Sequence, residues 1–331
     1  MAQNTSRTII AVDALGGDFA PQVVLDGAEL ALQRDADIQI LMVGPADTVE
    51  PFAANHTRVR AIPTTQVIAM DEHPAAAVRS KKDSSIVVCA RLVKEGAAQA
   101  TFSAGSTGAC LAAATLVTGR IKGVKRPALA VILPGARPTV LIDNGANADC
   151  KPEYLVQFAE MGRAYAQAAL GVEQPRIALL SIGEEDSKGN QLVLDAHALL
   201  RQQTAGFIGN VEGRDILAGA ADVIVCDGFT GNVVLKTLEG TLKFLLGKVK
   251  GAMTASTTSK LAALVLKGNM GALKDELDPD QYGAAPLLGV NGLCLVGHGS
   301  SNARAIASGI LVGARAVRGG VTDRITEALS R

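Results

Sequence analysis

Short apolar runs alternate with amphipathic stretches along this chain. Most of these runs are rich in Val and Ile, and a glycine-containing turn and a helical stretch follow them. Several runs show no polar alternation, which is typical of strands that are buried on both faces of a sheet. The pattern therefore predicts a three-layer α/β/α fold, with a mostly parallel sheet and helices on both sides.

The predicted elements cover most of the chain. The predicted strands are Thr8–Val12, Ile38–Val43, Ala100–Ser103, Ala128–Leu133, Thr139–Ile142, Arg176–Ser181, Asp222–Cys226 and Leu293–Val296. The predicted helices are Ser84–Glu95, Gly108–Thr118, Pro152–Leu170, Gln191–Gln203, Gly231–Met253 and Asn302–Arg318. Gly251–Tyr282 interrupts the alternation with an irregular helical pattern. We therefore expect a single domain over residues 1–331 with a helical excursion at about 251–282.

Polar, glycine-rich turns follow six of the predicted strands. They are DALGGD (Asp13–Asp18), SAGSTG (Ser103–Gly108), DNGAN (Asp143–Asn147), SIGEEDSKGN (Ser181–Asn190), DGFTGN (Asp227–Asn232) and GHGSSN (Gly297–Asn302). In open α/β sheets, ligands bind beyond the carboxyl ends of the strands. We therefore expect the six turns to lie on one edge of the sheet and to form a single cleft.

Three of these turns, SAGSTG, DGFTGN and GHGSSN, each open a predicted helix. Their glycines allow close approach of the backbone, and helix N-termini favour anions. Taken singly, their Ser, Thr and Asn side chains could be ordinary N-caps. The three turns together favour an anion site, with phosphate as the first candidate.

Composition narrows the class of function. The 331 residues include 32 Lys+Arg and 32 Asp+Glu, with 3% aromatic residues and no Trp, which argues against a nucleic-acid partner. The five cysteines are scattered without a CxxC pair and suit a reducing cytoplasm. The histidines show no metal-ligand spacing, so we predict no metal and no cofactor. The first apolar run stops at Asp13, and no run approaches the ~20 residues of a membrane-spanning helix.

Standard catalytic signatures are missing. GxxxxGK[ST] and GxSxG do not occur, and GHGSSN only approaches GxGxxG. Cys110 begins the predicted helix after SAGSTG and is better explained as a small core residue than as a nucleophile. His298 is the only histidine in a strand-end turn, where it could be an acid, a base, a donor or a structural residue. Lys188 precedes Gly189 and Asn190, in a turn that could direct its ammonium inward.

Eight motifs together resemble one family. DALGGDFAP, SAGSTGA, DNGANADCKPEYL, GEEDSKGN, NVEGRD, DGFTGNVVLK, GAAPLLGVNG and GHGSSN occur in this order over essentially the whole chain. In this the sequence resembles the PlsX family of acyl-(acyl carrier protein):phosphate acyltransferases of bacterial phospholipid synthesis. Leu15 stands where that family more often has Met, a change that preserves volume and polarity.

The resemblance implies a reaction, a fold and an assembly. Inorganic phosphate would attack the thioester of an acylated acyl carrier protein, and a membrane acyltransferase would then use the acyl phosphate. The implied fold is similar to that of isocitrate and isopropylmalate dehydrogenases and of phosphotransacetylase, and the implied assembly is a homodimer. Direct attack by phosphate needs no covalent enzyme intermediate, but it needs donors for the developing oxyanion.

Residue roles follow from this resemblance as hypotheses. Lys188 would neutralise phosphate or the oxyanion, Asn232 would donate to the carbonyl oxygen, and His298 would polarise that carbonyl or pass a proton to the leaving thiolate. The candidate phosphate- and substrate-binding residues are Asp13, Gly16, Gly17, Asp18, Ser103, Gly105, Ser106, Thr107, Gly108, Asp143, Asn144, Asn147, Glu184, Asp227, Thr230, Gly231, Gly299 and Ser300.

One segment concentrates positive charge. Residues 236–274 hold seven Lys and one acidic residue, Glu239, which leaves 25 of the 32 basic and 31 of the 32 acidic residues elsewhere, a net of −6. As far as Met253, we interpret it as a core or dimer-interface helix with a solvated basic face. For Ala255–Lys274 we expect contact with an anionic membrane surface or with the carrier protein. The expected location is the cytoplasm, with peripheral membrane association that is direct or goes through a membrane partner.

Three other functions compete with this one. A phosphotransacetylase-like enzyme that uses acyl-CoA shares the chemistry and differs in the carrier. An NAD-dependent β-decarboxylating dehydrogenase fits the fold, but the sequence lacks a complete dinucleotide fingerprint and a clear set of metal carboxylates. A non-catalytic adaptor that docks the carrier protein at the membrane would not need six polar turns.

Overall fold

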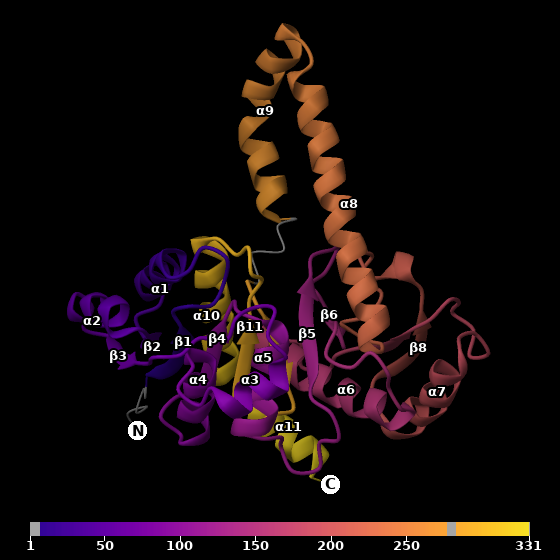
Figure 1. Cartoon of the computed structure of the whole chain (residues 1–331). Coiled ribbons are helices and arrows are strands. Elements are labelled where there is room, and N and C mark those ends of the chain that lie inside the picture. The colour runs from indigo at the N-terminus through magenta and orange to yellow at the C-terminus, as the bar shows by residue number, and fades with distance from the viewer. Residues whose placement is uncertain (1–6, 277–282, 331) are drawn as a thin grey trace, which may run out of the picture.

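The computed structural model describes residues 7–276 and 283–330 (Figure 1). In this part of the chain, eleven strands form one sheet in the order β3-β2-β1-β4-β11-β10-β5-β6-β9-β7-β8. The strands are β1 (Thr8–Asp13), β2 (Ile38–Gly44), β3 (Val59–Pro63), β4 (Ala100–Ser103), β5 (Ala128–Leu133), β6 (Thr139–Ile142), β7 (Ile177–Leu180), β8 (Phe207–Val211), β9 (Val223–Val225), β10 (Ala285–Leu288) and β11 (Leu293–Val296). The α-helices are α1 (Gln22–Arg34), α2 (Ala46–Ala54), α3 (Pro74–Ser80), α4 (Ser85–Lys94), α5 (Thr107–Ala113), α6 (Pro152–Tyr165), α7 (Gln191–Gln203), α8 (Gly228–Thr254), α9 (Thr257–Glu276), α10 (Ala303–Arg318) and α11 (Val321–Leu329).

Helices cover both faces of the sheet, as the sequence predicts. In β1, Ile10 and Val12 pack in the same core cluster as residues of α1 and α10. Ala11, between them, packs on the opposite side with residues of α4. A strand that is buried on both faces has apolar residues at successive positions, which explains the missing polar alternation. The predicted α/β class with a mostly parallel sheet is therefore confirmed.

The sheet contains two sets of parallel strands that run in opposite directions. The first set is β3, β2, β1, β4 and β11, and the second is β6, β9, β7 and β8. Between them, β11–β10, β10–β5 and β5–β6 are antiparallel pairs. The prediction that all six polar turns share one edge of the sheet is therefore wrong. The physical reason is the connection from Leu133 to Thr139, which is too short for a crossover and forces a hairpin.

Several elements escaped the sequence prediction. Strand β3 is an edge strand with half-exposed side chains and ends at Pro63, so it lacks an apolar run. Strand β10 has only four residues and includes Pro286. Helix α1 is unpredicted too, although its buried stripe packs against α10, where a Cβ on Gly27 would lie 2.6 Å from the side chain of Ile306.

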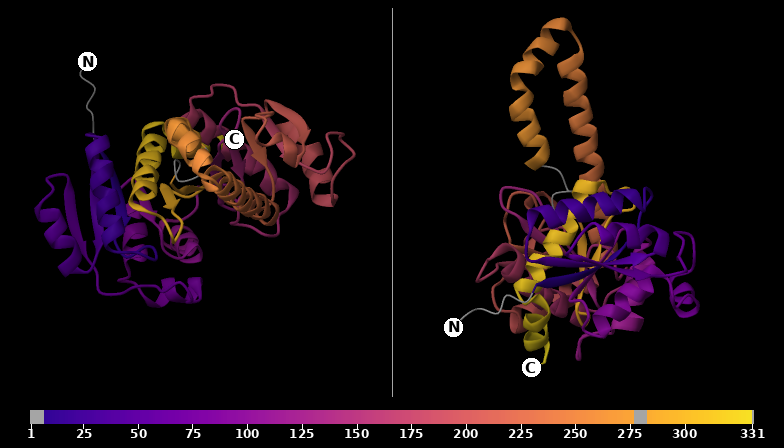
Figure 2. Two further views of the ribbon diagram at one scale, coloured as in Figure 1. Left: turned by 90° about the horizontal axis from the view of Figure 1, so that it is seen from above. Right: turned by 90° about the vertical axis from the view of Figure 1, so that its left-hand side faces the viewer.

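Helices α8 and α9 form a hairpin that projects from the body (Figures 1 and 2). Only Gly228 and Gly231 of α8 are buried, and Val234, Leu235 and Leu238 pack against the core while partly exposed. Helix α8 is therefore not a core helix beyond its first turns, and the alternative of a dimer-interface helix stays a prediction. The hairpin is also more regular than the predicted excursion and begins well before residue 251; residues 277–282 lie outside the described part. No helix in the described residues is long and apolar enough to span a membrane.

Candidate active site

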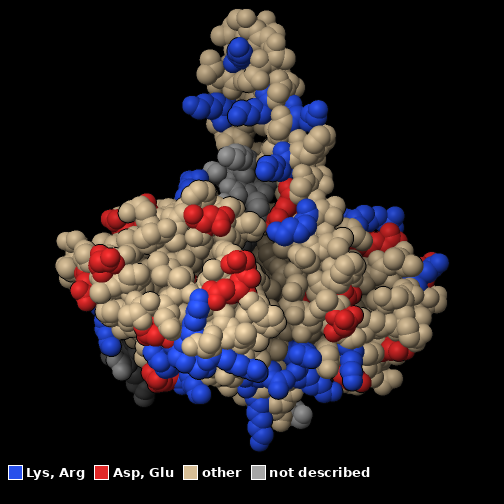
Figure 3. Space-filling model, viewed as in Figure 1, with Lys and Arg blue, Asp and Glu red and all other residues tan. Residues whose placement is uncertain are grey.

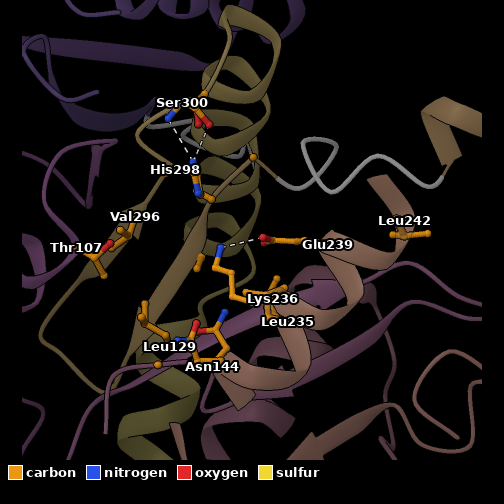
Figure 4. Close-up of a pocket in the computed structure, with 18 of the residues that line it drawn as sticks. Thr107, Leu129, Asn144, Leu235, Lys236, Glu239, Leu242, Val296, His298 and Ser300 are labelled. Carbon is orange, nitrogen blue, oxygen red and sulfur yellow. Dashed lines mark hydrogen bonds and ion pairs between the residues drawn. The ribbon is translucent and has the colours of Figure 1, made fainter. Parts of the chain in front are cut away.

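A cavity of about 700 Å³ lies at the base of the hairpin (Figure 4). Four of the six predicted turns reach it, through Thr107, Asn144 with Gly145, Asn232, and the turn from Gly297 to Ser301. Turns from both strand sets meet here because the antiparallel strands β10 and β5 lie between the sets. Strand β6 ends beside the start of β5, where Asn144 N–H donates to Leu129 O (3.0 Å), and β11 ends beside the start of β10. The cavity volume is typical of small-molecule sites.

Helix α8 supplies one wall of this cavity. The residues that face it recur every three or four positions: Asn232, Leu235, Lys236, Glu239, Leu242, Lys243 and Leu246. This spacing places them on one face of the helix. Nearer the start of α8, this face holds Asn232, Lys236 and Glu239 beside Leu235. Farther along, Leu242 and Leu246 flank Lys243, so the wall becomes less polar toward the projecting hairpin.

His298 lies in the turn after β11 and forms a local hydrogen-bond pair with Ser300. Its Nδ1 lies 2.8 Å from Ser300 Oγ and accepts the Ser300 backbone N–H at 3.2 Å. A ring nitrogen that accepts a backbone N–H carries no proton itself, so the neutral ring holds its proton on Nε2. His298 therefore presents Nε2–H as a donor, which favours the polarising role among those that the sequence left open.

Two buried polar atoms in the cavity wall have no hydrogen-bond partner within the described part of the chain. They are Asn144 Oδ1 and Ser301 Oγ, in side chains that are 6% and 4% exposed. A buried polar atom left unpaired costs about 1–3 kcal/mol. Both residues line the cavity through other atoms, because these two oxygens are themselves shielded from solvent.

Asp143 organises the turn that carries Asn144. Its carboxylate accepts backbone N–H groups of Leu129, Gly145, Ala146 and Asn147 at 2.7–3.2 Å, and it also accepts Asn147 Nδ2 at 2.8 Å. Burial raises the pKa of Asp143, and the hydrogen bonds from Ala146 and Asn147 partly offset that rise. Asp143 and Asn147 are thus turn-forming residues behind the cavity wall.

The first turn, DALGGD, supports its neighbours rather than lining the cavity. Asp13 is fully buried and accepts Ser103 Oγ–H at 2.7 Å, while Ser103 Oγ accepts Gly105 N–H at 3.0 Å. Burial raises the pKa of Asp13. Asp18 N–H donates to Gly299 O (2.8 Å), and a Cβ on Gly16 would lie 2.8 Å from Ala104 N. The turns after β1, β4 and β11 therefore hold one another in place.

Several predicted phosphate ligands act as helix caps instead. Ser106 Oγ accepts Ala109 N–H at 3.4 Å, and Asp227 Oδ1 accepts Thr230 N–H at 2.9 Å. Thr230 Oγ1–H donates to Asp227 Oδ2 at 2.7 Å. These side chains have the ordinary capping role, whereas Thr107, Asn232 and Ser300 line the cavity.

The turn after β7 does not reach this cavity. Lys188 and Glu184 are exposed, and the residues that line the cavity include neither. Glu184 instead faces Arg214 at 3.6 Å, and Lys188 O accepts Ser181 Oγ–H at 3.0 Å. The assignment of Lys188 as the phosphate cation stays a prediction, and the geometry does not support it.

Sequence reasoning missed Lys236 and Glu239 as site residues. Their side chains form an ion pair in the cavity, with Lys236 Nζ 2.8 Å from Glu239 Oε2. Figure 4 shows the Lys236 ammonium directed from α8 toward the turn that carries His298. Helical spacing could have indicated them, because Lys236 lies four residues after Asn232 and three before Glu239, which places all three on one face of the helix.

The cysteines do not supply a nucleophile. Cys110 is buried, and burial raises the pKa of its thiol well above the usual value, so the explanation as a core residue holds. Among the described residues, no group of three or more His, Cys, Asp or Glu side chains is arranged to hold a metal ion.

The fold defines a class. The structure is similar to a phosphotransacetylase from Streptococcus pyogenes, with a TM-score of 0.60 at 16% identity over 96% of this chain and 97% of that one. A branched-chain phosphotransacylase from Enterococcus faecalis V583 gives a TM-score of 0.59 at 14% identity over 94% and 99% of the two chains. At such low identity these similarities concern the fold alone, and the molecule has the α/β fold of the phosphotransacylases.

Sequence comparison gives the particular family. The chain belongs to the fatty acid synthesis protein family, whose model matches residues 8–324. It is 48% identical to the phosphate acyltransferase of Desulfitobacterium hafniense over 97% of this chain and 98% of that protein. It is 50% identical to the phosphate acyltransferase of Heliobacterium modesticaldum over 93% and 94% of the two chains. The family resemblance read from the sequence motifs is thus confirmed.

Proposed function

We propose that this chain is a phosphate acyltransferase that moves a fatty acyl group from acyl carrier protein to inorganic phosphate, giving acyl phosphate for phospholipid synthesis. The observation that carries this proposal is the polarity of the cavity. Hydrogen-bonding groups from Thr107, Asn232, His298 and Ser300 face one space, and Leu242 and Leu246 of α8 continue its wall toward the projecting hairpin. Such a site suits a substrate with a polar reacting group and an apolar chain.

The reaction needs few protein groups. An oxygen of HPO₄²⁻ attacks the thioester carbonyl carbon, and the C–O bond forms as the C–S bond breaks. The phosphate proton ends on the departing sulfur, so the products are the acyl phosphate dianion and a free thiol. The protein positions the two reactants and stabilises the charge that develops on the carbonyl oxygen.

We assign the cavity residues to these tasks. Thr107 and the glycine-rich backbone from residue 297 donate to phosphate, while Ser300 Oγ–H donates to His298 Nδ1 and orients the ring. Asn232 and His298 Nε2–H donate to the carbonyl oxygen. The buried amide of Asn144 pairs with the polar part of the acyl donor. Asp13, Asp143 and Asn147 keep the turns in position.

Phosphate-dependent release of thiol tests this function. Long-chain acyl carrier protein and acetyl-CoA are each incubated with the chain and inorganic phosphate, and acyl phosphate is trapped with hydroxylamine. We expect acyl phosphate from the carrier protein. Turnover of acetyl-CoA alone would make the chain a phosphotransacetylase-like enzyme, and no phosphate-dependent turnover at all would favour an adaptor.

A covalent acyl-enzyme on Ser300 is the competing mechanism, because this hydroxyl lies next to His298. His298 and Ser300 are two residues apart in one turn, and no carboxylate of the described residues is hydrogen-bonded to the His298 ring to orient it as a catalytic base. We therefore expect Ser300→Ala to keep part of its turnover. Complete loss together with an acylated Ser300 in the parent protein would replace direct attack with a two-step transfer.

The projecting hairpin suggests where the partners bind. Leu261, Leu264 and Val265 are 62%, 67% and 86% exposed, and Lys side chains surround the hairpin (Figure 3). We propose that this surface serves homodimer formation and peripheral contact with an anionic membrane or with the acidic carrier protein in the cytoplasm. It would bring the acyl phosphate close to a membrane acyltransferase.

A further inference from the structure

The ion pair between Lys236 and Glu239 has no role in the function described so far. We propose that Lys236 is the catalytic cation that binds phosphate in the cavity, and that Glu239 is a positioning residue for its ammonium. This inference rests on the proposed function and adds the main electrostatic contact to it.

The position of Lys236 on α8 carries the inference. It follows Asn232 by four residues, so both side chains lie on the face of α8 that lines the cavity. Across the cavity lie His298 and Ser300, the residues to which we assign the reacting groups (Figure 4). A phosphate held by that turn would therefore face the Lys236 ammonium.

The charges that line the cavity give Lys236 its importance. Lys236 and Lys243 are the cationic side chains among the lining residues, and Glu239 is the acidic one. Lys243 lies two turns farther along α8, beside Leu242 in the mostly apolar part of the wall. Lys236 is thus the cation nearest to the polar end of the cavity, where a dianion needs a positive partner.

Glu239 can position the ammonium without consuming it. A lysine ammonium has three N–H donors. One donor is directed at Glu239 Oε2, at 2.8 Å, and two remain for other acceptors. The Lys236 and Glu239 side chains are 51% and 34% exposed, so the pair stays open to solvent and to an incoming ion.

The other polar groups of the cavity do not replace this cation. Thr107, Asn232 and His298 offer hydrogen bonds beside Lys236, but neutral donors cannot balance the charge of a dianion. Lys188, the cation that the sequence suggested, is exposed and does not line this cavity. The geometry therefore assigns the phosphate contact to Lys236.

Steady-state kinetics of the full chain test the inference. The KM for inorganic phosphate is measured at saturating acyl carrier protein for the parent, Lys236→Met, Lys236→Arg, Glu239→Gln and the Lys236→Met/Glu239→Gln double variant. Lys250→Met is the matched control, because it removes the same charge from an exposed position of α8 that does not line the cavity. Lys188→Met is measured in parallel as the rival cation.

Lys236→Met is expected to raise the KM for phosphate roughly 10- to 100-fold, the usual effect of losing a charged hydrogen bond. Lys236→Arg should recover part of this loss. Lys250→Met should stay within about twofold of the parent, since an exposed charge away from the site contributes little. Glu239→Gln should have a smaller effect that disappears in the double variant, because Glu239 acts only through Lys236.

Three results would overturn the assignment of Lys236. They are an unchanged phosphate KM in Lys236→Met, an equal rise in Lys250→Met, or a rise in Lys188→Met alone. Additive effects in the double variant would overturn the positioning role of Glu239. If the parent forms no acyl phosphate, the proposed function fails, and calorimetric titration with inorganic phosphate decides between the same variants.

Discussion

Gly231 packs directly against the main-chain carbonyl of Asp143. A Cβ on residue 231 would lie 1.9 Å from that oxygen, far inside van der Waals contact. Because Asp143 also accepts the N–H groups of the DNGAN turn, this contact joins the first turn of α8 to the turn that carries Asn144. The α8 wall of the cavity and the Asn144 wall are thereby held together.

Gly231→Ala should destabilise the protein and disturb the cavity. Overpacking against backbone typically costs about 1–3 kcal/mol, and here we expect about 3 kcal/mol because main chain has to move. Urea unfolding measures the change. Gly240→Ala on the same helix is the control: apart from the adjacent helix backbone, no atom of the described residues lies within 4 Å of a Cβ there, so stability should rise by up to about 1 kcal/mol. Equal stability of the two variants would contradict the packing described.

Asp13 should make stability depend on pH. Burial raises the pKa of Asp13 above the ordinary 3.8. At a pH between 3.8 and the raised pKa, the folded state keeps a proton that the unfolded state has lost. Stability should therefore fall as pH rises through this window, by at most about 1.4 kcal/mol per pH unit. Asp13→Asn should remove this component in urea unfolding between pH 4 and pH 7. A steeper slope in the variant would contradict the direction given for the pKa.

Asn232→Ala should preserve the fold and abolish most acyl-phosphate formation. Loss of one donor to a developing oxyanion costs about 10²–10³ in kcat. Val233→Ala is the control, because Val233 is 51% exposed on α8 and does not line the cavity. Rates are measured by hydroxylamine trapping at saturating substrates. A kcat near that of the parent would contradict the role of Asn232 as a donor to the carbonyl oxygen.

The hairpin should bind anionic vesicles through its apolar surface. Replacing both Leu261 and Leu264 with Ser should reduce co-sedimentation with vesicles that contain phosphatidylglycerol, because each exposed leucine loses its contact with lipid. Ile208→Ser, at an exposed site on β8 in the body, serves as the control. Light scattering shows whether dimer formation has changed. Unreduced binding of the double variant would place any membrane contact elsewhere.

The sequence predicts the class of fold because local patterns dominate it. The strands β1 and β5 contain continuous apolar runs, and α10 carries a strong apolar stripe. Strand direction is harder to predict, because it depends on which strands become neighbours. The short link between β5 and β6 was the one local indication of a reversal, and β10 leaves little signal with four residues and a proline.

The candidate site was predictable in its turns but only partly in its side chains. Asn232 and His298 reach the cavity as the motifs suggested, whereas Ser106 is used to cap α5. Lys236 was counted with the positive charge of the hairpin because charge along the chain does not show which helix face a residue occupies. The glycine-containing turn of Lys188 favours an inward ammonium, yet β7 lies outside β9 in the sheet, and its turn does not line the cavity.

The central position of β11 has a consequence for the order in which the protein is made. This strand lies between β4 and β10, so the sheet stays divided until residue 293 and its successors have been synthesised. Helix α10, which follows it, covers α1 from the opposite end of the chain. Strands β5 to β9 are contiguous in the chain and emerge from the ribosome earlier. A nascent chain that stalls before β11 therefore exposes an unpaired edge of β4 and lacks the turn of His298, and the cavity closes only when synthesis is nearly complete.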